Sequence, residues 1–128
     1  MPHNSNGSNG QMFEMETFKG NAISKEYADK RMRNEPIVEI TQVKGTSETH
    51  PWLSPDDEWA DFEIMDVRVG SRPPTYSNAS GSYVREAYLS GLTLDFTKQG
   101  NPYKFGLIGS SDTHTGAGAF DENNYWSK

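Results

Sequence analysis

The sequence contains no cysteine, and that absence excludes several kinds of chemistry. The chain cannot form a disulfide, bind zinc through thiolates or use a cysteine nucleophile. It also lacks an apolar run long enough to span a bilayer, and its first residues show no basic segment followed by an apolar one, as a signal peptide would. We therefore expect a soluble protein without a signal peptide in this chain, and its cellular location stays open.

Apolar residues and basic clusters are scarce as well. Hydrophobic residues make up 33% of the 128 residues and the mean hydropathy is −0.83, so we expect one domain with a small or incomplete core. The formal net charge is −6, and no dense group of lysine and arginine counters it. This balance argues against binding to nucleic-acid phosphates or to anionic membrane surfaces.

Helical and extended patterns alternate along the chain. A helix is predicted over residues 24–34, where a serine can cap it and Pro36 stops it, and a second helix over residues 82–94. Strands are predicted for residues 37–43 and 104–109. This alternation is typical of an α/β fold with parallel pairing.

Polar, turn-rich segments separate these elements. Residues 3–10 have the composition of a disordered tail or linker, although their Asn and Ser side chains can also orient a ligand. Residues 44–58 form a long loop of the kind that often serves as a lid or a site wall. Acidic residues at 56–58 predict the first turn of a short helix to about residue 64, and residues 66–81 predict a surface connection.

The segment that follows the last predicted strand carries the strongest functional signal. Its apolar run changes directly into Ser-Ser-Asp-Thr-His, as a buried strand that ends at a polar site would. If the chain stays extended, the side chains of Asp112 and His114 point to the same face and can hold a divalent metal at the C-terminal end of the strand. The alternative is a turn, with Asp112 in local hydrogen bonds and His114 exposed.

Glu39 is the one carboxylate in the strand at 37–43, where it stands among Ile and Val residues. A buried carboxylate needs an ion-pair partner, hydrogen bonds or a metal, because an isolated buried charge is costly. The alternative is an edge strand that leaves Glu39 in water. The sequence supports the two interpretations about equally.

All three histidines, His3, His50 and His114, lie in polar segments with oxygen-bearing residues nearby. Imidazole and carboxylate ligands without cysteine suit zinc, manganese or iron in a hydrolytic site, because they leave coordination positions open for water. Such metals lower the pKa of bound water and bind the oxygens of a transferring phosphoryl group. The residue types therefore indicate a divalent metal cofactor.

A set of segments resembles a known bacterial family. The set comprises residues 2–6, 35–40, 44–51, 82–87, 101–106 and 111–114. It looks like the C-terminal part of the family catalogued as domain of unknown function 3604, which is similar to the PHP (polymerase and histidinol phosphatase) metal-dependent hydrolases. The resemblance covers nearly the whole chain and implies a distorted β/α barrel of the TIM-like, PHP type.

The resemblance also implies roles for individual residues. Ser-Asp-Thr-His matches the last metal-binding motif of PHP proteins, which implies Asp112 and His114 as metal ligands. Pro-His-Asn matches a mid-chain histidine motif, which implies His3. His50 is a further plausible metal ligand, and Glu48 a plausible site residue, as is the glutamate of the strand at 37–43.

The chain departs from the PHP pattern at its start. PHP-like proteins begin with a strand that carries His-x-His or His-x-Asp, and no such motif is present here. A β/α barrel needs about 250 residues, so 128 residues cannot close one. We therefore expect residues 1–128 to be a partial barrel, the C-terminal portion of a larger PHP-like hydrolase domain. Its exposed sheet edges predict a homo-oligomer that covers them.

The first functional hypothesis is a metal-dependent hydrolase that acts on a small anionic substrate, a phosphoric or related ester. In it Glu39 or Glu48 assists catalysis and Arg85 neutralises the substrate, although Arg85 also fits a surface ion pair. The second hypothesis is a non-catalytic α/β remnant that acts only in assembly or binding. A phosphate-binding loop at 106–111 is a weaker third, because the segment lacks the Gly-Lys-Ser/Thr ending.

Overall fold

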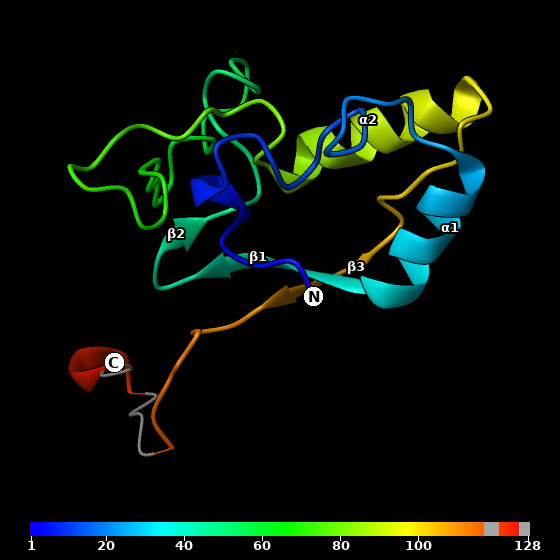
Figure 1. Ribbon diagram of the computed structural model, residues 1–128. Helices are drawn as coiled ribbons and strands as arrows, with labels where there is room; N and C mark the ends of the chain where they lie inside the picture. Colours follow the sequence, from blue (N-terminus) through cyan, green and yellow to red (C-terminus); the bar gives the residue numbers. More distant parts are fainter. Residues whose placement is uncertain (117–120, 126–128) are drawn as a thin grey trace.

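The computed structural model describes residues 1–116 and 121–125 (Figure 1). Its helices are α1 (Lys25–Asn34) and α2 (Val84–Phe96), its strands are β1 (Ile37–Gln42), β2 (Gly45–Thr46) and β3 (Gly106–Gly109), and two short 3-10 helices are η1 (Ser5–Gly7) and η2 (Glu122–Asn124). Both α-helices lie on the same side of the sheet, together with most of the loops. The predicted mixed α/β class is confirmed.

Helix α1 agrees closely with the prediction for residues 24–34. The Ser24 hydroxyl accepts a hydrogen bond from the backbone N–H of Tyr27 at 3.2 Å, which satisfies one donor of the first helical turn. Lys25 and Asp29 form an ion pair one turn apart, with 3.0 Å between Nζ and Oδ2. Neither α-helix among the described residues has the length and apolar character that a membrane crossing requires.

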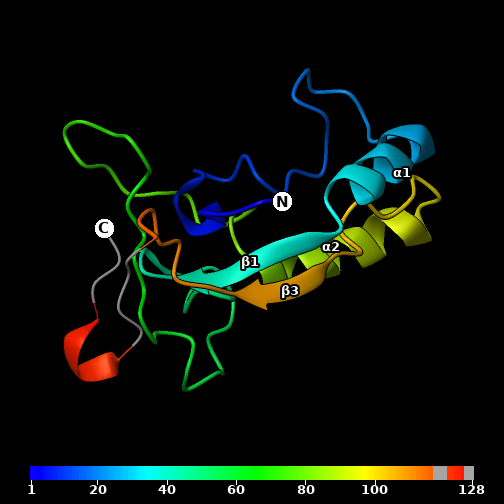
Figure 2. The same cartoon turned by 90° about the horizontal axis from the view of Figure 1, so that it is seen from below.

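β1 is the central strand of a sheet with the order β2-β1-β3. It pairs in parallel with β3, where Val38 lies opposite Leu107, and antiparallel with β2. The N-terminal segment runs beside β1, away from β3 (Figure 2), and the Glu39 N–H donates to the Pro2 carbonyl at 3.1 Å. The predicted strand positions are confirmed, whereas β2 lies in a segment that was predicted to be loop.

A small aromatic core joins the sheet to the helices. Phe13 packs edge-on against Tyr103, with ring centroids 5.6 Å apart, and lies 5.7 Å from Phe105. Val38 of β1 and Leu94 of α2 complete the same buried cluster. The core is small, as the low hydrophobic content predicted.

The prediction of a tail or linker at residues 3–10 is wrong. Ser5, Asn6 and Gly7 form η1 and are buried. The Asn6 amide donates to the carbonyls of Lys44 and Met65, at 2.8 Å each, and thereby joins the N-terminus to two distant loops. Composition is misleading here because Asn and Ser can satisfy buried backbone groups as well as solvent.

Two further predictions fail. Residues 56–64 form turns and no helix, because the Asp57 side chain accepts the Trp59 N–H at 3.0 Å and Glu63 adopts a φ of 51°. β3 is present but exposed, and Leu107 retains 51% of its accessible surface. Within the described sheet β3 pairs along one edge, with β1, so its side chains lack neighbours on the far side.

Candidate functional site

The candidate site lies where β1 and β3 end side by side. After β3 the backbone N–H of Ser110 still donates to the Thr41 carbonyl, at 3.1 Å, and the chain then turns away. Asp112 has a φ of 53°, so the chain is no longer extended there and strand alternation does not decide where its side chain points. The turn nevertheless brings Asp112 Oδ1 and His114 Nε2 to 3.3 Å.

Glu39 lies in the interior of the sheet, only 2% exposed. Its Oε1 atom accepts a hydrogen bond from the Ser110 hydroxyl at 3.2 Å. Its Oε2 atom is buried and has no hydrogen-bond partner among the residues that the structure describes. The interpretation of Glu39 as an exposed edge residue is therefore wrong. A buried carboxylate oxygen without a partner is a costly feature that often marks a ligand or an ion position.

Lys44 contributes the positive charge of the site and was not predicted from the sequence. Lys44 lies in the turn between β1 and β2, and its ammonium forms a salt bridge with Asp112 Oδ2. The Lys44 N–H donates to the Gln42 side chain at 2.9 Å, which holds this turn against β1. Its position in the sequence could have indicated it, because Lys44 directly follows the predicted strand and active-site residues of α/β folds lie at the C-terminal ends of strands. Ser110 carried the same signal.

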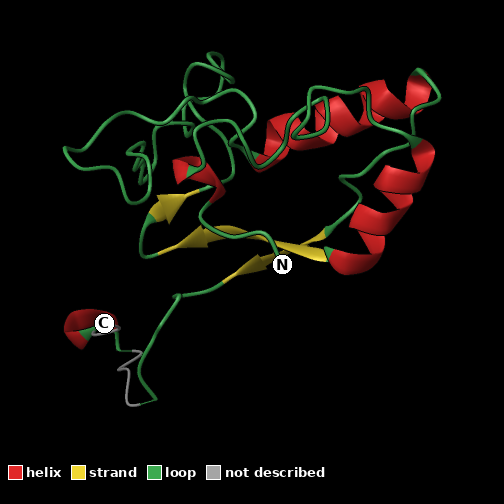
Figure 3. Cartoon of the chain, in the orientation of Figure 1, coloured by secondary structure: helices red, strands yellow, loops and turns green. Residues whose placement is uncertain are grey.

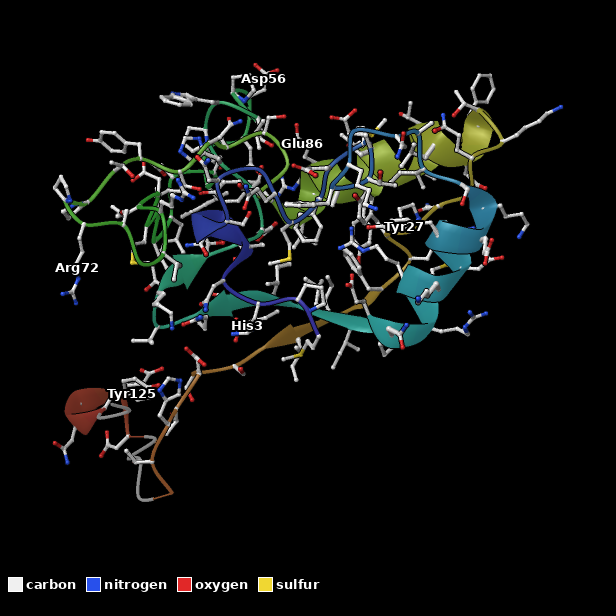
Figure 4. The ribbon with its side chains drawn as sticks, viewed as in Figure 1. His3, Tyr27, Asp56, Arg72, Glu86 and Tyr125 are labelled. Atoms are coloured by element: carbon white, nitrogen blue, oxygen red, sulfur yellow. The ribbon has the colours of Figure 1, made fainter. Side chains whose placement is uncertain are left out.

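The structure separates the three predicted histidine ligands into different environments. His3 is exposed and lies beside the strands (Figure 4), one residue after the Pro2 carbonyl that binds β1. His50 is buried, its Nδ1 accepts the Trp52 N–H at 3.2 Å, and its ring lies 5.5 Å from that of Tyr83. The side chain of His114 is largely exposed.

Glu48 and Arg85 form a separate ionic cluster together with Asp57. The Arg85 guanidinium donates to Asp57 Oδ2 at 2.6 Å and to the Glu48 carboxylate. The hydrogen bond from Arg85 holds the pKa of Asp57 below its usual value, and the two carboxylates raise the pKa of Arg85. Two of the three residues predicted to serve catalysis, Glu48 and Arg85, thus bind each other. Asp57, which the sequence placed in a helical turn, completes the cluster.

Comparison with known proteins identifies the family. The family model described as "Protein of unknown function (DUF3604)" matches residues 1–128. The chain belongs to the DUF3604 family. Searches of curated proteins and of solved structures return no match. The function of this DUF3604 chain must therefore be argued from its own residues.

The donor atoms of this DUF3604 chain fit a divalent metal in part. Asp112 and His114 present a carboxylate and an imidazole side by side, and Glu39 has a buried oxygen without a partner. These are the ligand types that zinc, manganese and iron share. Within residues 1–116 and 121–125, however, no three His, Cys, Asp or Glu side chains are grouped closely enough to hold a metal. The described structure thus brings together two of the predicted ligands and leaves His3 and His50 apart from them.

Proposed function

We propose that this chain takes part in the metal-dependent hydrolysis of phosphoric or related esters. The observation that carries the proposal is the Asp112–His114 pair at the C-terminal end of β3, with 3.3 Å between Oδ1 and Nε2. The neighbouring unpartnered Oε2 of Glu39 supports it, as does the resemblance of residues 111–114 to a PHP metal-binding motif. We also propose that the complete hydrolase domain is a β/α barrel of the PHP type, of which this chain is the C-terminal portion.

In this proposal Asp112 and His114 hold the divalent metal. When bound, the metal supplies Lewis-acid activation of water and charge neutralisation at the ester oxygens. The Ser110 hydroxyl fixes the Glu39 carboxylate through a 3.2 Å hydrogen bond to Oε1, which leaves Oε2 for the reaction. In the proposed reaction Glu39 serves as the proton acceptor.

Lys44 gives the proposal its preference for an anionic substrate. Its side chain is 27% exposed, so the ammonium contacts Asp112 and remains reachable from solvent. A lysine ammonium carries three donors and can serve a carboxylate and a phosphoryl oxygen at the same time. In this respect Lys44 fits the role of substrate neutralisation better than Arg85, whose guanidinium is shared by two carboxylates.

The second candidate function is assembly or binding without catalysis. Exposed apolar side chains favour it, since Leu89, Leu92 and Phe96 recur along the outer face of α2 at helical spacing and all are largely exposed. Contiguous apolar surface of this kind often marks a protein–protein contact. Metal binding distinguishes the two candidates, because assembly alone requires none.

The decisive experiment is the metal content of the purified chain after incubation with zinc or manganese and desalting. We expect metal to be retained by the parent and lost in an Asp112→Asn/His114→Gln double variant. Asp56→Asn is the matched control, because Asp56 is an exposed carboxylate outside the candidate site. Equal metal content in the parent and the double variant would contradict the ligand assignment.

Hydrolysis is then measured with a chromogenic phosphate monoester in the presence of the retained metal. Lys44→Gln should raise KM more than it lowers kcat, because it removes charge that binds the substrate. Retained metal without turnover of any phosphoric, sulfuric or carboxylic ester would favour the binding function.

A further inference from the structure

A cavity on the loop-rich side of the molecule is separate from the Asp112–His114 pair. It has a volume of about 340 Å³ and lies between the segment after β2 and the first turn of α2. This size is at the lower end of the range for small-molecule sites, which begins at about 300 Å³. The surrounding segment consists of loops and turns (Figure 3). The N–H of Val84, at the start of α2, donates to the Ser47 carbonyl at 2.9 Å and so joins the helix to the segment after β2.

Two aromatic side chains line this cavity and stay exposed. Trp59 retains 72% and Phe62 64% of their accessible surface. Ala60, between them in the sequence, is buried, and its N–H donates to the Asp57 carbonyl at 3.1 Å. Aromatic rings of this size are usually covered in a folded protein, because their burial is strongly favourable. Exposed together at one cavity, the two rings are available to contact a ligand.

The charges of the cavity favour a cation. Its one guanidinium, that of Arg85, faces the two carboxylates of Glu48 and Asp57, which leaves an excess of one negative charge. The chain between residues 45 and 67 contains seven acidic residues and no lysine or arginine. Four of those acids, Asp56, Glu58, Asp61 and Glu63, are exposed around the turns. Their summed field concentrates cations and repels anions.

We propose that this cavity binds a small organic cation with a methylated ammonium group. Such a group is large, weakly hydrated and cationic, so it gains from the faces of Trp59 and Phe62 through cation–π attraction and from the excess carboxylate charge. A phosphate or carboxylate ligand is disfavoured, because Arg85 already serves Glu48 and Asp57. The proposal goes beyond ester hydrolysis and requires neither Asp112 nor His114.

The test uses choline as the probe, measured by calorimetry and by the methyl proton signal of choline in NMR spectra. Saturable binding with an upfield shift of that signal is expected, because protons over an aromatic face are shielded. The uncharged isostere, in which a tert-butyl group replaces the trimethylammonium group, should bind about tenfold more weakly or not at all. Inorganic phosphate should not compete.

Substitutions of the residues that line the cavity test whether choline binds there. Trp59→Ala should weaken choline binding about fivefold or more, whereas Trp59→Phe should retain most of it. Glu48→Gln should also weaken binding, because it removes the excess negative charge. Trp52→Ala is the matched control, since Trp52 is an exposed tryptophan of the same loop that does not line the cavity. Circular dichroism spectra of all variants establish that they are folded.

Three results would overturn the proposal. They are the absence of saturable choline binding by the folded parent chain, binding of the uncharged isostere as tight as that of choline, and unchanged affinity in Trp59→Ala. Loss of metal binding in the Asp112→Asn/His114→Gln variant with choline binding retained is the expected pattern if the two sites are independent.

Discussion

At the scale of single residues, two buried tyrosines differ in one hydrogen bond. The Tyr103 hydroxyl donates to the Glu14 carbonyl, whereas the Tyr83 hydroxyl is buried without a partner in the described part of the chain. Burial raises the pKa of each to about 12, with a further contribution at Tyr83 from nearby Asp66. The two side chains therefore form a natural comparison.

We predict that Tyr103→Phe lowers the free energy of unfolding by about 1 kcal/mol, because it leaves the Glu14 carbonyl unpaired. Tyr83→Phe should leave stability unchanged or slightly raised, since it removes a hydroxyl that has no partner. Urea unfolding at neutral pH measures both. An equal loss in the two variants would contradict the assignment of the hydrogen bond.

The pH dependence has a defined sign for these same residues. Below about pH 10 both tyrosines are neutral in the folded and unfolded chains and contribute no dependence. Between pH 10 and about 12 the unfolded chain loses protons that the folded chain keeps, so stability falls as pH rises. Each Phe variant should show a smaller loss over this interval.

At the scale of elements, α2 approaches the turn before β3 closely at Gly91. A Cβ atom at Gly91 would lie 2.2 Å from Asn101 Oδ1, and Asn101 is itself buried. The same Oδ1 accepts the Tyr103 N–H at 2.8 Å, so Asn101 cannot move without breaking that hydrogen bond. The contact between α2 and this turn therefore requires glycine.

We predict that Gly91→Ala destabilises the chain by about 1–3 kcal/mol, although alanine has the higher helix propensity. Ser90→Ala is the matched control on the same helix, where the gain in propensity should appear without the clash. Thermal unfolding distinguishes them. A rise in stability for Gly91→Ala would show that Asn101 moves freely.

At the scale of the whole molecule, the edge strand β3 leaves apolar side chains uncovered. β3 pairs along one edge in the described sheet, and Leu107 and Ile108 on its two faces are exposed. An exposed, apolar edge strand is a template for pairing with another chain. Self-association through this edge of β3 therefore stays a prediction that solution measurements can check.

We predict a concentration-dependent dimer in light scattering after size exclusion. Leu107→Lys should shift the population toward monomer, because a charged side chain on an edge strand opposes pairing. Asn34→Lys places the same charge on the exposed end of α1 and serves as the control. A monomer mass for the parent at every concentration would contradict the prediction.

Local signals in the sequence determined the regular elements. The Ser24 cap and Pro36 bounded α1, and the Ile and Val residues at 37–43 marked β1, because capping and side-chain period depend on neighbours in sequence. The same signals failed where side chains serve distant partners. Asp57 was expected in a helical turn but binds Arg85. Asn6 was expected in a tail but is buried against loops far along the chain.

Part of the candidate site was also determined by the sequence. Asp112 and His114 were predicted from their position after β3, and the structure brings them together even though the chain is no longer extended there. The burial of Glu39, the ion pair between Lys44 and Asp112, and the binding of Arg85 by Glu48 and Asp57 were decided only by tertiary structure. Each depends on residues from separate segments of the chain. Spacing in the sequence does not reveal which of these side chains the fold brings into contact.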